Sequence, residues 1–375
     1  MKKGYYIHFN QKDGKSGVSK KIDEQINVLK KYFDLNEINI VDKKRTILRK
    51  ILSRLPFGYI AKEYNTALST ISNPDFIYIR RTFADRGYYL FIKKVKKIYP
   101  NVKILIEIYT YPYDKDDFGF HKGLNFLYYP KDVMYRKKLR KYIDRYVTYS
   151  IDNTIFKVKT INILNGIDFN KIPLQKHLFD DKTINIVALG IFQNHSGYDR
   201  IIKGLGNYYK TGTNRDIKIF FIGKDISRKQ KTVKKYNILI EKYNLAQRIE
   251  FCGYLTDEEQ TKIFEKASLA LGSFGAHRDG IMITSELKSR TYLARGIPIV
   301  AGCGIDVINN NKEDFFLKLP ADDSDVNFED IINFYDVLYS KYKVEELQQH
   351  IRKYGEQYVD INNTFLPVIN YINGR

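Results

Sequence analysis

The sequence predicts an α/β protein built from two doubly wound, parallel-sheet domains. Short apolar runs alternate with amphipathic stretches along nearly the whole chain, which is the pattern of repeated strand and helix units. The chain has 375 residues, of which 43% are hydrophobic, enough to bury two cores. No apolar run approaches the roughly 18 to 20 residues that span a bilayer, and the polar start is not typical of a signal peptide. We therefore expect a cytoplasmic protein.

The first half of the chain has the pattern of one such domain, expected at residues 1–168. Its strands are expected at 5–9, 37–41, 75–79, 103–109 and 145–150, and its helices at 19–33, 86–98 and 131–143. The second domain is expected at 169–354. Its strands are expected at 184–190, 217–223, 249–253, 269–274, 297–302 and 315–320, and its helices at 198–210, 227–245, 256–267 and 285–295. Residues 328–375 are expected to be helical.

The positive charge lies almost entirely in the first half. The whole chain has a formal net charge of +20. Residues 1–168 contain 34 Lys and Arg against 17 Asp and Glu, a balance of +17, whereas residues 169–375 contain 29 against 26, a balance of +3. A codon bias toward Lys would raise the Lys content of both halves of the chain to a similar extent. The asymmetry favours a first domain that meets an anionic surface through clusters at 43–54 and 135–145, although a solvated helix face is the alternative for each cluster.

A segment from Ser285 to Gly302 joins an amphipathic helix directly to a buried strand. Ser285 is expected as the N-cap, and Gly296 followed by Pro298 ends the helix. The free amides and positive dipole at a helix start attract anions, and Lys288 adds a full charge one turn into the helix. The segment therefore predicts a phosphate-binding helix.

This segment also carries a family resemblance. The pattern LKxRxYxAxGxPIV at 287–300 resembles the donor-binding helix of GT-B glycosyltransferases of the family 4 type. Residues 162–168, 186–205, 219–225 and 249–274 are similar, in order, to that family's hinge strand and the following elements of its second domain. Residues 14–22, 75–81 and 107–116 look like members that build bacterial surface polysaccharides. The resemblance implies two Rossmann-like domains facing a cleft, with a last segment, 355–375, that crosses back to the first domain.

The resemblance implies where the donor lies, since open parallel sheets bind ligands at the C-terminal ends of their strands. The family's paired glutamates are replaced here by Ile283 and Thr291, and its usual Arg and Lys by Ile191 and Ser196. The backbone of Glu286 and Leu287, with Lys288, is expected to hold phosphate, and Lys288 to take part in catalysis. The remaining donor-side candidates are Gly17, His195, Arg200 and Lys224 for phosphate, and Arg278, Asp279, Glu286, Thr291, Gly253 and Tyr254 for the sugar and nucleoside. For Glu286, the alternative is an acid that only stabilises the helix dipole.

Acceptor-side candidates come from the first half. Gly14 and Gly17 allow close backbone approach after the first strand, and Ser19 is expected to cap the next helix. Glu107 ends a strand, where it would bind an acceptor hydroxyl or act as a base, unless it is a buried structural carboxylate. The acceptor-side set is Gly14, Lys15, Ser16, Arg80, Glu107 and Tyr111.

We expect neither a metal nor another cofactor beyond the donor substrate. Cys252 and Cys303 lack metal-site spacing and are expected in the core. The acidic turns at 114–117 and 322–325 lack the spacing of a calcium loop. Glu258 and Glu259 lie in a helix capping box that begins at Thr256. The resemblance likewise implies no required metal.

The resulting expectation is a transferase. It would move a hexose-type sugar, with retention, from a nucleotide diphosphate-sugar to a lipid-linked or polysaccharide acceptor in capsule, exopolysaccharide or lipopolysaccharide synthesis, on the inner face of a bacterial cell membrane. One alternative is a sugar-nucleotide epimerase of similar fold. Another is a non-catalytic basic module that binds membrane or nucleic acid, although no nucleic-acid-binding motif is recognisable and no nucleic acid is expected as a partner.

Overall fold

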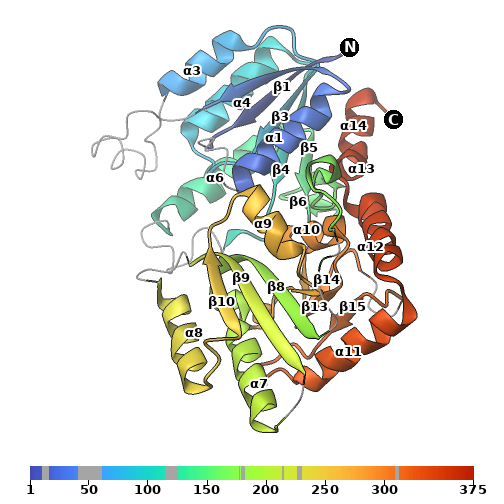
Figure 1. Cartoon of the computed structure of the whole chain (residues 1–375). Helices are drawn as coiled ribbons and strands as arrows, with labels where there is room; N and C mark the ends of the chain where they lie inside the picture. The colour runs from blue at the N-terminus through green and yellow to red at the C-terminus, as the bar shows by residue number, and fades with distance from the viewer. Residues whose placement is uncertain are drawn as a thin grey trace. The chain divides into compact units, whose positions relative to one another are not determined.

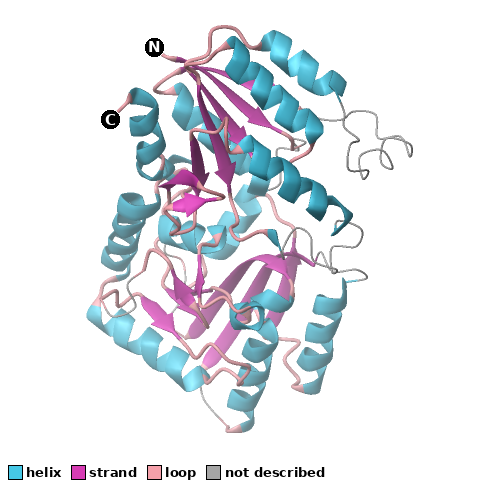
Figure 2. Cartoon of the chain, turned by 180° about the vertical axis from the view of Figure 1, so that it is seen from behind, coloured by secondary structure: helices cyan, strands magenta, loops and turns pink. Residues whose placement is uncertain are grey.

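The computed structural model describes residues 1–10, 17–40, 61–114, 126–176, 178, 182–212, 215–225, 230–308 and 312–375. The chain divides into two compact units (Figure 1). Unit 1 comprises Met1–Leu164 and Ile361–Arg375, and unit 2 comprises Asn165–Asp360. Each unit is a predominantly parallel sheet with helices on both faces (Figure 2). The predicted fold class, with two Rossmann-like parallel-sheet units, is confirmed.

Unit 1 has a seven-stranded sheet in the order β2-β1-β3-β4-β5-β7-β6. All neighbours pair in parallel except β6 with β7. Its strands are β1 (Lys3–His8), β2 (Asp34–Asn39), β3 (Phe76–Arg80), β4 (Lys103–Ile108), β5 (Arg145–Thr148), β6 (Thr154–Ile155) and β7 (Val158–Asn162). Its helices are α1 (Gly17–Lys30), α3 (Ala61–Thr70), α4 (Arg86–Ile98), α6 (Tyr129–Leu139), α13 (Ile361–Thr364) and α14 (Leu366–Asn373).

The strand alternation of unit 1 directs its side chains into two cores. Tyr5 and Ile7 on β1 pack with α3, α4 and α6, whereas Tyr6 packs on the other face with α1, α13 and α14. The chain ends therefore share one core: Phe365 and Ile369 of the last helices contact the same cluster as Tyr6. Ser19, expected as an N-cap, lies inside the first turn of α1, because the helix begins two residues earlier at Gly17.

Unit 2 has a six-stranded parallel sheet in the order β10-β9-β8-β11-β13-β15. Renumbered along the unit, this is the 3-2-1-4-5-6 order of the Rossmann fold. Its strands are β8 (Thr183–Phe192), β9 (Asp216–Asp225), β10 (Ile249–Gly253), β11 (Leu269–Leu271), β13 (Ile299–Ala301) and β15 (Phe316–Lys318), with β12 (Ile283–Thr284) and β14 (Gly304–Ile305) as a separate pair. Its helices are α7 (Tyr198–Lys210), α8 (Lys231–Lys242), α9 (Asp257–Phe264), α10 (Leu287–Arg295), α11 (Phe328–Lys341) and α12 (Val344–Val359), with 3-10 turns η2 (Phe169–Lys171), η3 (Asn194–Ser196) and η5 (Ala276–Asp279).

The two faces of the unit 2 sheet bury separate cores. Helices α7, α8 and α11 cover one face, and α9, α10 and α12 cover the other. Cys303 is buried as expected, but Cys252 is only partly buried, because β10 is an edge strand and exposes one side. The capping box from Thr256 to Glu259 is present at the start of α9. No helix in the described residues has the length and apolarity needed to cross a membrane.

The loops that follow β8 and β11 are joined by main-chain hydrogen bonds. The amides of Phe274 and Gly275 donate to the carbonyls of Ser196 and His195, at 2.9 and 3.1 Å. Gly197, which separates η3 from α7, has φ +65°, and a Cβ there would lie 2.2 Å from the amide nitrogen of Gly275. The loops meet this closely because residue 197 has no side chain.

We predict that Gly197→Ala destabilises unit 2 through this contact. Gly212→Ala is the matched control, because Gly212 also has a positive φ, +76°, but no heavy atom of the described residues lies within 4 Å of the added Cβ. The control should cost about 1 kcal/mol of unfolding free energy for the left-handed backbone. Gly197→Ala should cost roughly 1 to 3 kcal/mol more, measured by urea denaturation. Equal costs for the two variants would contradict the close packing.

Candidate functional site

The chemistry-bearing residues of unit 2 gather where the strand order reverses, between β8 and β11. The pairing of these strands covers Ile186 with Leu269 and Val187 with Ala270. Beyond it the strands separate, and the hydroxyl of Tyr292 on α10 joins them, accepting from the Leu189 amide at 2.7 Å and donating to the Leu271 carbonyl at 3.1 Å. Such a reversal is where doubly wound sheets bind ligands. Tyr292 thus fixes α10 at this point.

The amino end of α10 is open. The helix begins at Leu287, with Glu286 as N-cap and no side chain capping its first amides in the described chain. The prediction of Ser285 as N-cap was wrong, because Ser285 is held outside the helix: its carbonyl accepts from Asn165 at 2.9 Å and its hydroxyl from Arg290 at 3.2 Å. The first amides of α10 are therefore available to an anion.

Lys288 lies over the end of β8. Its ammonium donates to the hydroxyl of Tyr198 at 3.1 Å and lies 3.5 Å from Oε2 of Glu286, and only 11% of the side chain is exposed. Its Cδ lies 3.8 Å from the position that a Cβ on Gly190 would take. Burial, and then the charge of Glu286, raise the pKa of Tyr198 well above its usual value, so its hydroxyl stays neutral. We call Gly190, Tyr198, Ser273, Glu286 and Lys288 with the first amides of α10 the α10 cradle.

Glu286 has one engaged and one unengaged carboxylate oxygen. Its Oε2 accepts from the Ser273 hydroxyl at 2.7 Å, whereas its Oε1 is buried and has no hydrogen-bond partner among the described residues. Gly272 leaves the space beside that oxygen, since a Cβ there would lie 3.3 Å from Oε1. An unpaired buried oxygen is costly unless a ligand supplies the missing donor. Glu286 is the N-cap of α10 rather than a member of the first helical turn.

The loops after β8 and β11 form a paired charge cluster beside the cradle. Arg278 makes a two-point ion pair with Asp199, both contacts at 3.1 Å, and its Nε donates to Asp323 at 2.7 Å. His195 lies 3.1 Å from Asp279. The sequence predicted Arg278 and Asp279 for sugar hydroxyls and His195 for phosphate. The structure places each of the three in an ion pair within unit 2.

Arg200, predicted to bind phosphate, is instead buried and holds loop carbonyls. Its guanidinium donates to the carbonyls of Ser324, Phe274 and Pro320, at 2.6, 2.8 and 3.1 Å. The side chain is 1% exposed. Because its donors are engaged by the protein, the geometry corrects the expected phosphate contact to a structural one.

The remaining donor-side candidates of unit 2 separate into two groups. Lys224, at the end of β9, lies 5.9 Å from the ring of Tyr254, which follows Gly253 at the end of β10 and is 59% exposed. These three residues share the C-terminal edge of the sheet with the cradle. Thr291 lies within α10, where its hydroxyl donates to the Leu287 carbonyl at 3.2 Å, so its side chain is bonded to its own helix.

Unit 1 buries Glu107 in a polar network. Its Oε1 accepts from Gln25, Arg80 and Tyr149, at 3.2, 3.1 and 3.0 Å, and its Oε2 accepts from Tyr78 at 3.0 Å. Glu107 is 0% exposed. Both oxygens are engaged, so the structure favours the buried structural carboxylate over the predicted base or acceptor ligand. Arg80, a second acceptor-side candidate, is its buried counter-charge.

The other acceptor-side candidates lie apart from this network. Tyr111 is partly buried and meets Phe156 edge-on, with ring centroids 5.7 Å apart. Gly17 is the first residue of α1. Gly14, Lys15 and Ser16 lie outside the described residues, as does the basic cluster at 43–54.

One polar pair at the end of β1 was missed from the sequence. His8 is fully buried, its Nε2 lies 2.9 Å from Oε1 of Glu37 on β2, and its Nδ1 has no partner within the residues that the structure describes. β1 borders the strand-order reversal of unit 1, between β1 and β3. A histidine as the last residue of a strand was the available signal. Among the described residues, no cluster of three or more His, Cys, Asp or Glu side chains is arranged to hold a metal.

We predict that Glu107→Gln lowers the unfolding free energy by roughly 3 kcal/mol or more, because it leaves the buried Arg80 without its counter-charge. Tyr149→Phe is the control, since it removes one of the four hydrogen bonds and should cost about 1 kcal/mol. Both are measured by urea denaturation. Near wild-type stability for Glu107→Gln would refute the structural role.

Asp199 gives a prediction of pH dependence. Burial raises its pKa, but hydrogen bonds from Arg278 and Lys235 outweigh burial and bring the pKa below the usual value. An acid whose pKa is lower in the folded than in the unfolded state stabilises the fold at pH values above its unfolded-state pKa. This stabilisation is lost as the pH falls through its folded-state pKa. Asp199→Asn should therefore be less stable than wild type at pH 7 by about 2 kcal/mol. The difference should shrink as the pH falls below about 4.

Asp336→Asn is the control for this pH series. Asp336 pairs with Arg215 at 3.1 Å but is 52% exposed, so its loss should change stability little at any pH. Melting temperatures of the three proteins between neutral and acidic pH give the comparison. A constant gap between wild type and Asp199→Asn across that range would contradict the lowered pKa.

Comparison with known proteins places this geometry in a known fold. No protein-family model and no curated protein matches the sequence. Among solved structures, HepE of Anabaena in complex with UDP matches with a TM-score of 0.67 and 13% identity, covering 100% of both chains. Sucrose-phosphate synthase of Thermosynechococcus elongatus matches with a TM-score of 0.63 and 11% identity, covering 100% of this chain and 98% of the other.

A glycosyltransferase of Rickettsia africae matches with a TM-score of 0.63 and 14% identity over 99% of both chains. The similarity extends over both units, and these structures are glycosyltransferases of the GT-B type. The chain therefore has the GT-B fold.

Proposed function

We propose that the protein is a glycosyltransferase that takes a hexose-type sugar from a nucleotide diphosphate-sugar. The observation that carries the proposal is the open amino end of α10 with Lys288, at the strand-order reversal of unit 2. A diphosphate matches this arrangement, because amides and an ammonium supply hydrogen bonds and positive charge at one place.

The α10 cradle is arranged to stabilise a nucleoside diphosphate as it leaves the sugar. Negative charge grows on the diphosphate as its bond to the sugar breaks, and the amides of α10 and Lys288 are already fixed to receive it. Tyr198 and Glu286 hold the ammonium in place through contacts at 3.1 and 3.5 Å. In the proposed reaction the departing phosphate accepts the proton of the acceptor hydroxyl, and the anomeric configuration is retained. No general base from Glu107 is then required.

Glu286 is our candidate for a sugar hydroxyl. Its Oε1 is buried and has no partner in the described part of the chain, and a sugar hydroxyl can donate a hydrogen bond to it. The position where the resemblance would place the family's first acid is occupied by Ile283, which is 64% exposed on β12. A carboxylate three residues later would then take over part of that role.

The donor we favour is a UDP-sugar. HepE of Anabaena has been crystallised with UDP and with UDP-glucose. Lys224 and Tyr254, on the same sheet edge as the cradle, offer a charge and an exposed ring for the nucleoside side of such a donor. The rest of the predicted donor set, His195, Arg200, Arg278 and Asp279, supports the loops rather than the ligand.

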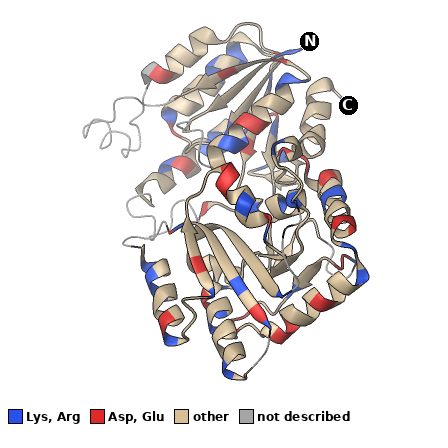
Figure 3. Ribbon diagram, viewed as in Figure 1, with Lys and Arg blue, Asp and Glu red and all other residues tan. Residues whose placement is uncertain are grey.

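The acceptor we favour is lipid-linked, in the synthesis of a bacterial surface polysaccharide. The net positive charge of the first half of the chain supports it, and the ribbon is coloured blue at Lys and Arg in Figure 3. At the end of α6, Lys137, Lys138, Arg140 and Lys141 are exposed, in contrast to Arg136, which is paired with Asp114 and Asp132. Such a surface would place unit 1 against anionic lipid head groups at the inner face of the membrane.

The two alternative functions, an epimerase and a basic binding module, predict different biochemical results. An epimerase would convert a nucleotide-sugar with no acceptor present. A basic binding module would show steep salt dependence toward membrane or nucleic acid and take up no nucleotide-sugar. Product analysis with and without acceptor, together with donor binding, separates the three.

We predict that one nucleotide-sugar from a panel of UDP-, GDP- and ADP-sugars raises the melting temperature of the protein. Saturation at 100 times Kd corresponds to about 2.7 kcal/mol of stabilisation. Lys288→Ala should lose most of this shift and most of the transfer activity, because it removes the charge that faces the diphosphate. Lys234→Ala, an exposed lysine on α8, is the matched control.

The melting temperature of each variant without ligand confirms that it is folded. A folded Lys288→Ala protein with normal donor shift and normal turnover would remove Lys288 from the mechanism. Absence of stabilisation by every nucleotide-sugar would count against the transferase itself.

A further inference from the structure

The edge of the unit 2 sheet at β15 has unpaired main-chain groups. β15 is the last strand in the sheet order, and within the described residues it pairs with β13 alone. That pairing uses the Phe315 carbonyl and the Leu319 amide, with Leu317 between them. The amides and carbonyls of Phe316 and Lys318 therefore point away from β13, and no hydrogen bond involving them is found within the described chain. Two donors and two acceptors face outward along one short strand.

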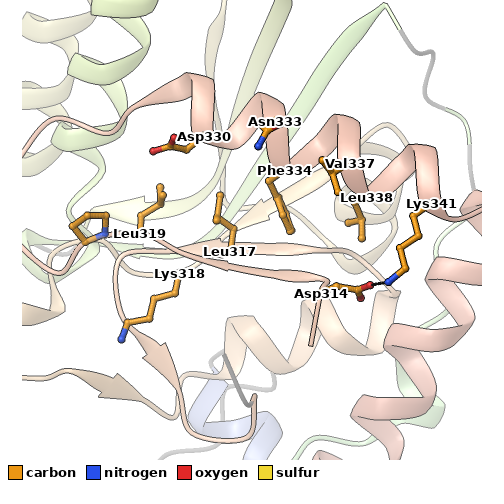
Figure 4. Close-up of a pocket in the computed structure, with 11 residues that line it drawn as sticks. Asp314, Leu317, Lys318, Leu319, Asp330, Asn333, Phe334, Val337, Leu338 and Lys341 are labelled. Atoms are coloured by element: carbon orange, nitrogen blue, oxygen red, sulfur yellow. Dashed lines mark hydrogen bonds and ion pairs between the residues drawn. The ribbon is translucent and has the colours of Figure 1, made fainter. Parts of the chain in front are cut away.

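An apolar groove lies along this edge, between β15 and α11 (Figure 4). Its volume is about 570 Å³. The strand side is lined by Leu317 and Leu319, and the helix side by Phe334, Val337 and Leu338. Val337 is 57% exposed. The groove belongs to neither the α10 cradle nor the loops beside it.

Charges of opposite sign lie at each end of the groove. Figure 4 places Lys318 and Asp330 toward one end and Asp314 and Lys341 toward the other. Asp314 pairs with Lys341 and accepts from the hydroxyl of Tyr342 at 2.8 Å. A two-fold axis normal to the sheet exchanges the two ends. In a dimer with this symmetry, Lys318 of one copy would lie near Asp314 of the other. Asp330 of one copy would likewise lie near Lys341 of the other.

The same axis aligns the main-chain groups. In an antiparallel pair of β15 strands centred on Leu317, Phe316 of each copy lies opposite Lys318 of the other, and the two residues exchange both hydrogen bonds. The two Leu317 side chains then face each other on the groove side. A lysine on a strand edge opposes most pairings, but in this arrangement Lys318 lies near Asp314 of the second copy.

From this match we infer that β15 and α11 form the interface of a symmetric homodimer. The partner is a second copy of this chain, bound so that the two unit 2 sheets continue through antiparallel β15 strands while their α11 helices pack antiparallel over them. The interface is isologous, as two-fold symmetry requires. The inference does not depend on the proposed transferase activity.

The test is the molecular mass of the full chain in solution, by sedimentation or light scattering over a range of concentrations. Wild type should be a dimer, and Val337→Lys should raise its dissociation constant at least tenfold by burying a charge in the groove. Ile238→Lys is the matched control: Ile238 is 66% exposed on α8, outside the groove, and its substitution should leave the dimer unchanged. Donor-induced thermal shifts should be unaltered in both variants, because neither residue lies in the cradle.

Charge reversal tests the arrangement itself. Asp330→Lys and Lys341→Asp should each weaken their own homodimer, because each brings like charges together. Mixing the two variants should restore a dimer, since both contacts between them are then attractive. A wild-type chain that stays monomeric at about 100 µM overturns the inference. A dimer whose dissociation constant is unchanged by Val337→Lys would also overturn it. So would a monomeric chain whose groove binds an extended peptide in place of a second copy.

Discussion

The candidate site depends on one buried hydroxyl. Strands β8 and β11 pair for only a short length and then separate, leaving a main-chain donor on one and an acceptor on the other. The Tyr292 hydroxyl satisfies both, at 2.7 and 3.1 Å. Because Tyr292 belongs to α10, the same two hydrogen bonds that close the gap also fix the amino end of the helix near the ends of both strands. The positions of Glu286 and Lys288 follow from this anchoring, since both lie within two turns of Tyr292 along the chain.

Three arginines of the two units make contacts within the protein. Arg80 balances Glu107, Arg200 holds three carbonyls, and Arg278 is divided between Asp199 and Asp323. A planar guanidinium with five donors suits several acceptors at once, so it can fasten loops that lack regular pairing. Lys288 differs, because its ammonium meets one hydroxyl and one carboxylate and lies next to uncapped helix amides. This contrast is why we assign the lysine to the ligand and the arginines to the protein.

The sequence predicted most of the fold because apolar periodicity is local. The helices expected at 86–98 and 198–210 have the observed bounds, and the expected strands of both sheets are present. Helix α3 and the strands β6, β7, β12 and β14 were not predicted. Three of these strands, β6, β12 and β14, have only two residues and therefore no period of their own. The helix expected from Ser285 begins two residues later, because contacts from Asn165 and Arg290 hold that serine outside the helix.

The candidate site was harder to predict than the fold. Lys288 and Glu286 are adjacent to the helix start, where a local rule applies. The roles of Arg200, Arg278 and Glu107 depend instead on partners more than 20 residues away in sequence, such as Phe274, Asp199 and Tyr78. His8 was overlooked for the same reason, since its carboxylate partner lies on the neighbouring strand. Pair formation between distant residues has no signature in a single sequence.

The two ends of the chain share one core, and this has a consequence for biosynthesis. The face of the unit 1 sheet that bears Tyr6 and Tyr78 is covered partly by α1 and partly by Phe365, Val368 and Ile369 from the last fifteen residues. A ribosome makes those residues only after the whole of unit 2. Until they emerge, the nascent first unit has an uncovered apolar face, whereas unit 2 is continuous in sequence and has all its own helices by residue 360. Unit 1 is thus begun before unit 2 but completed only after it.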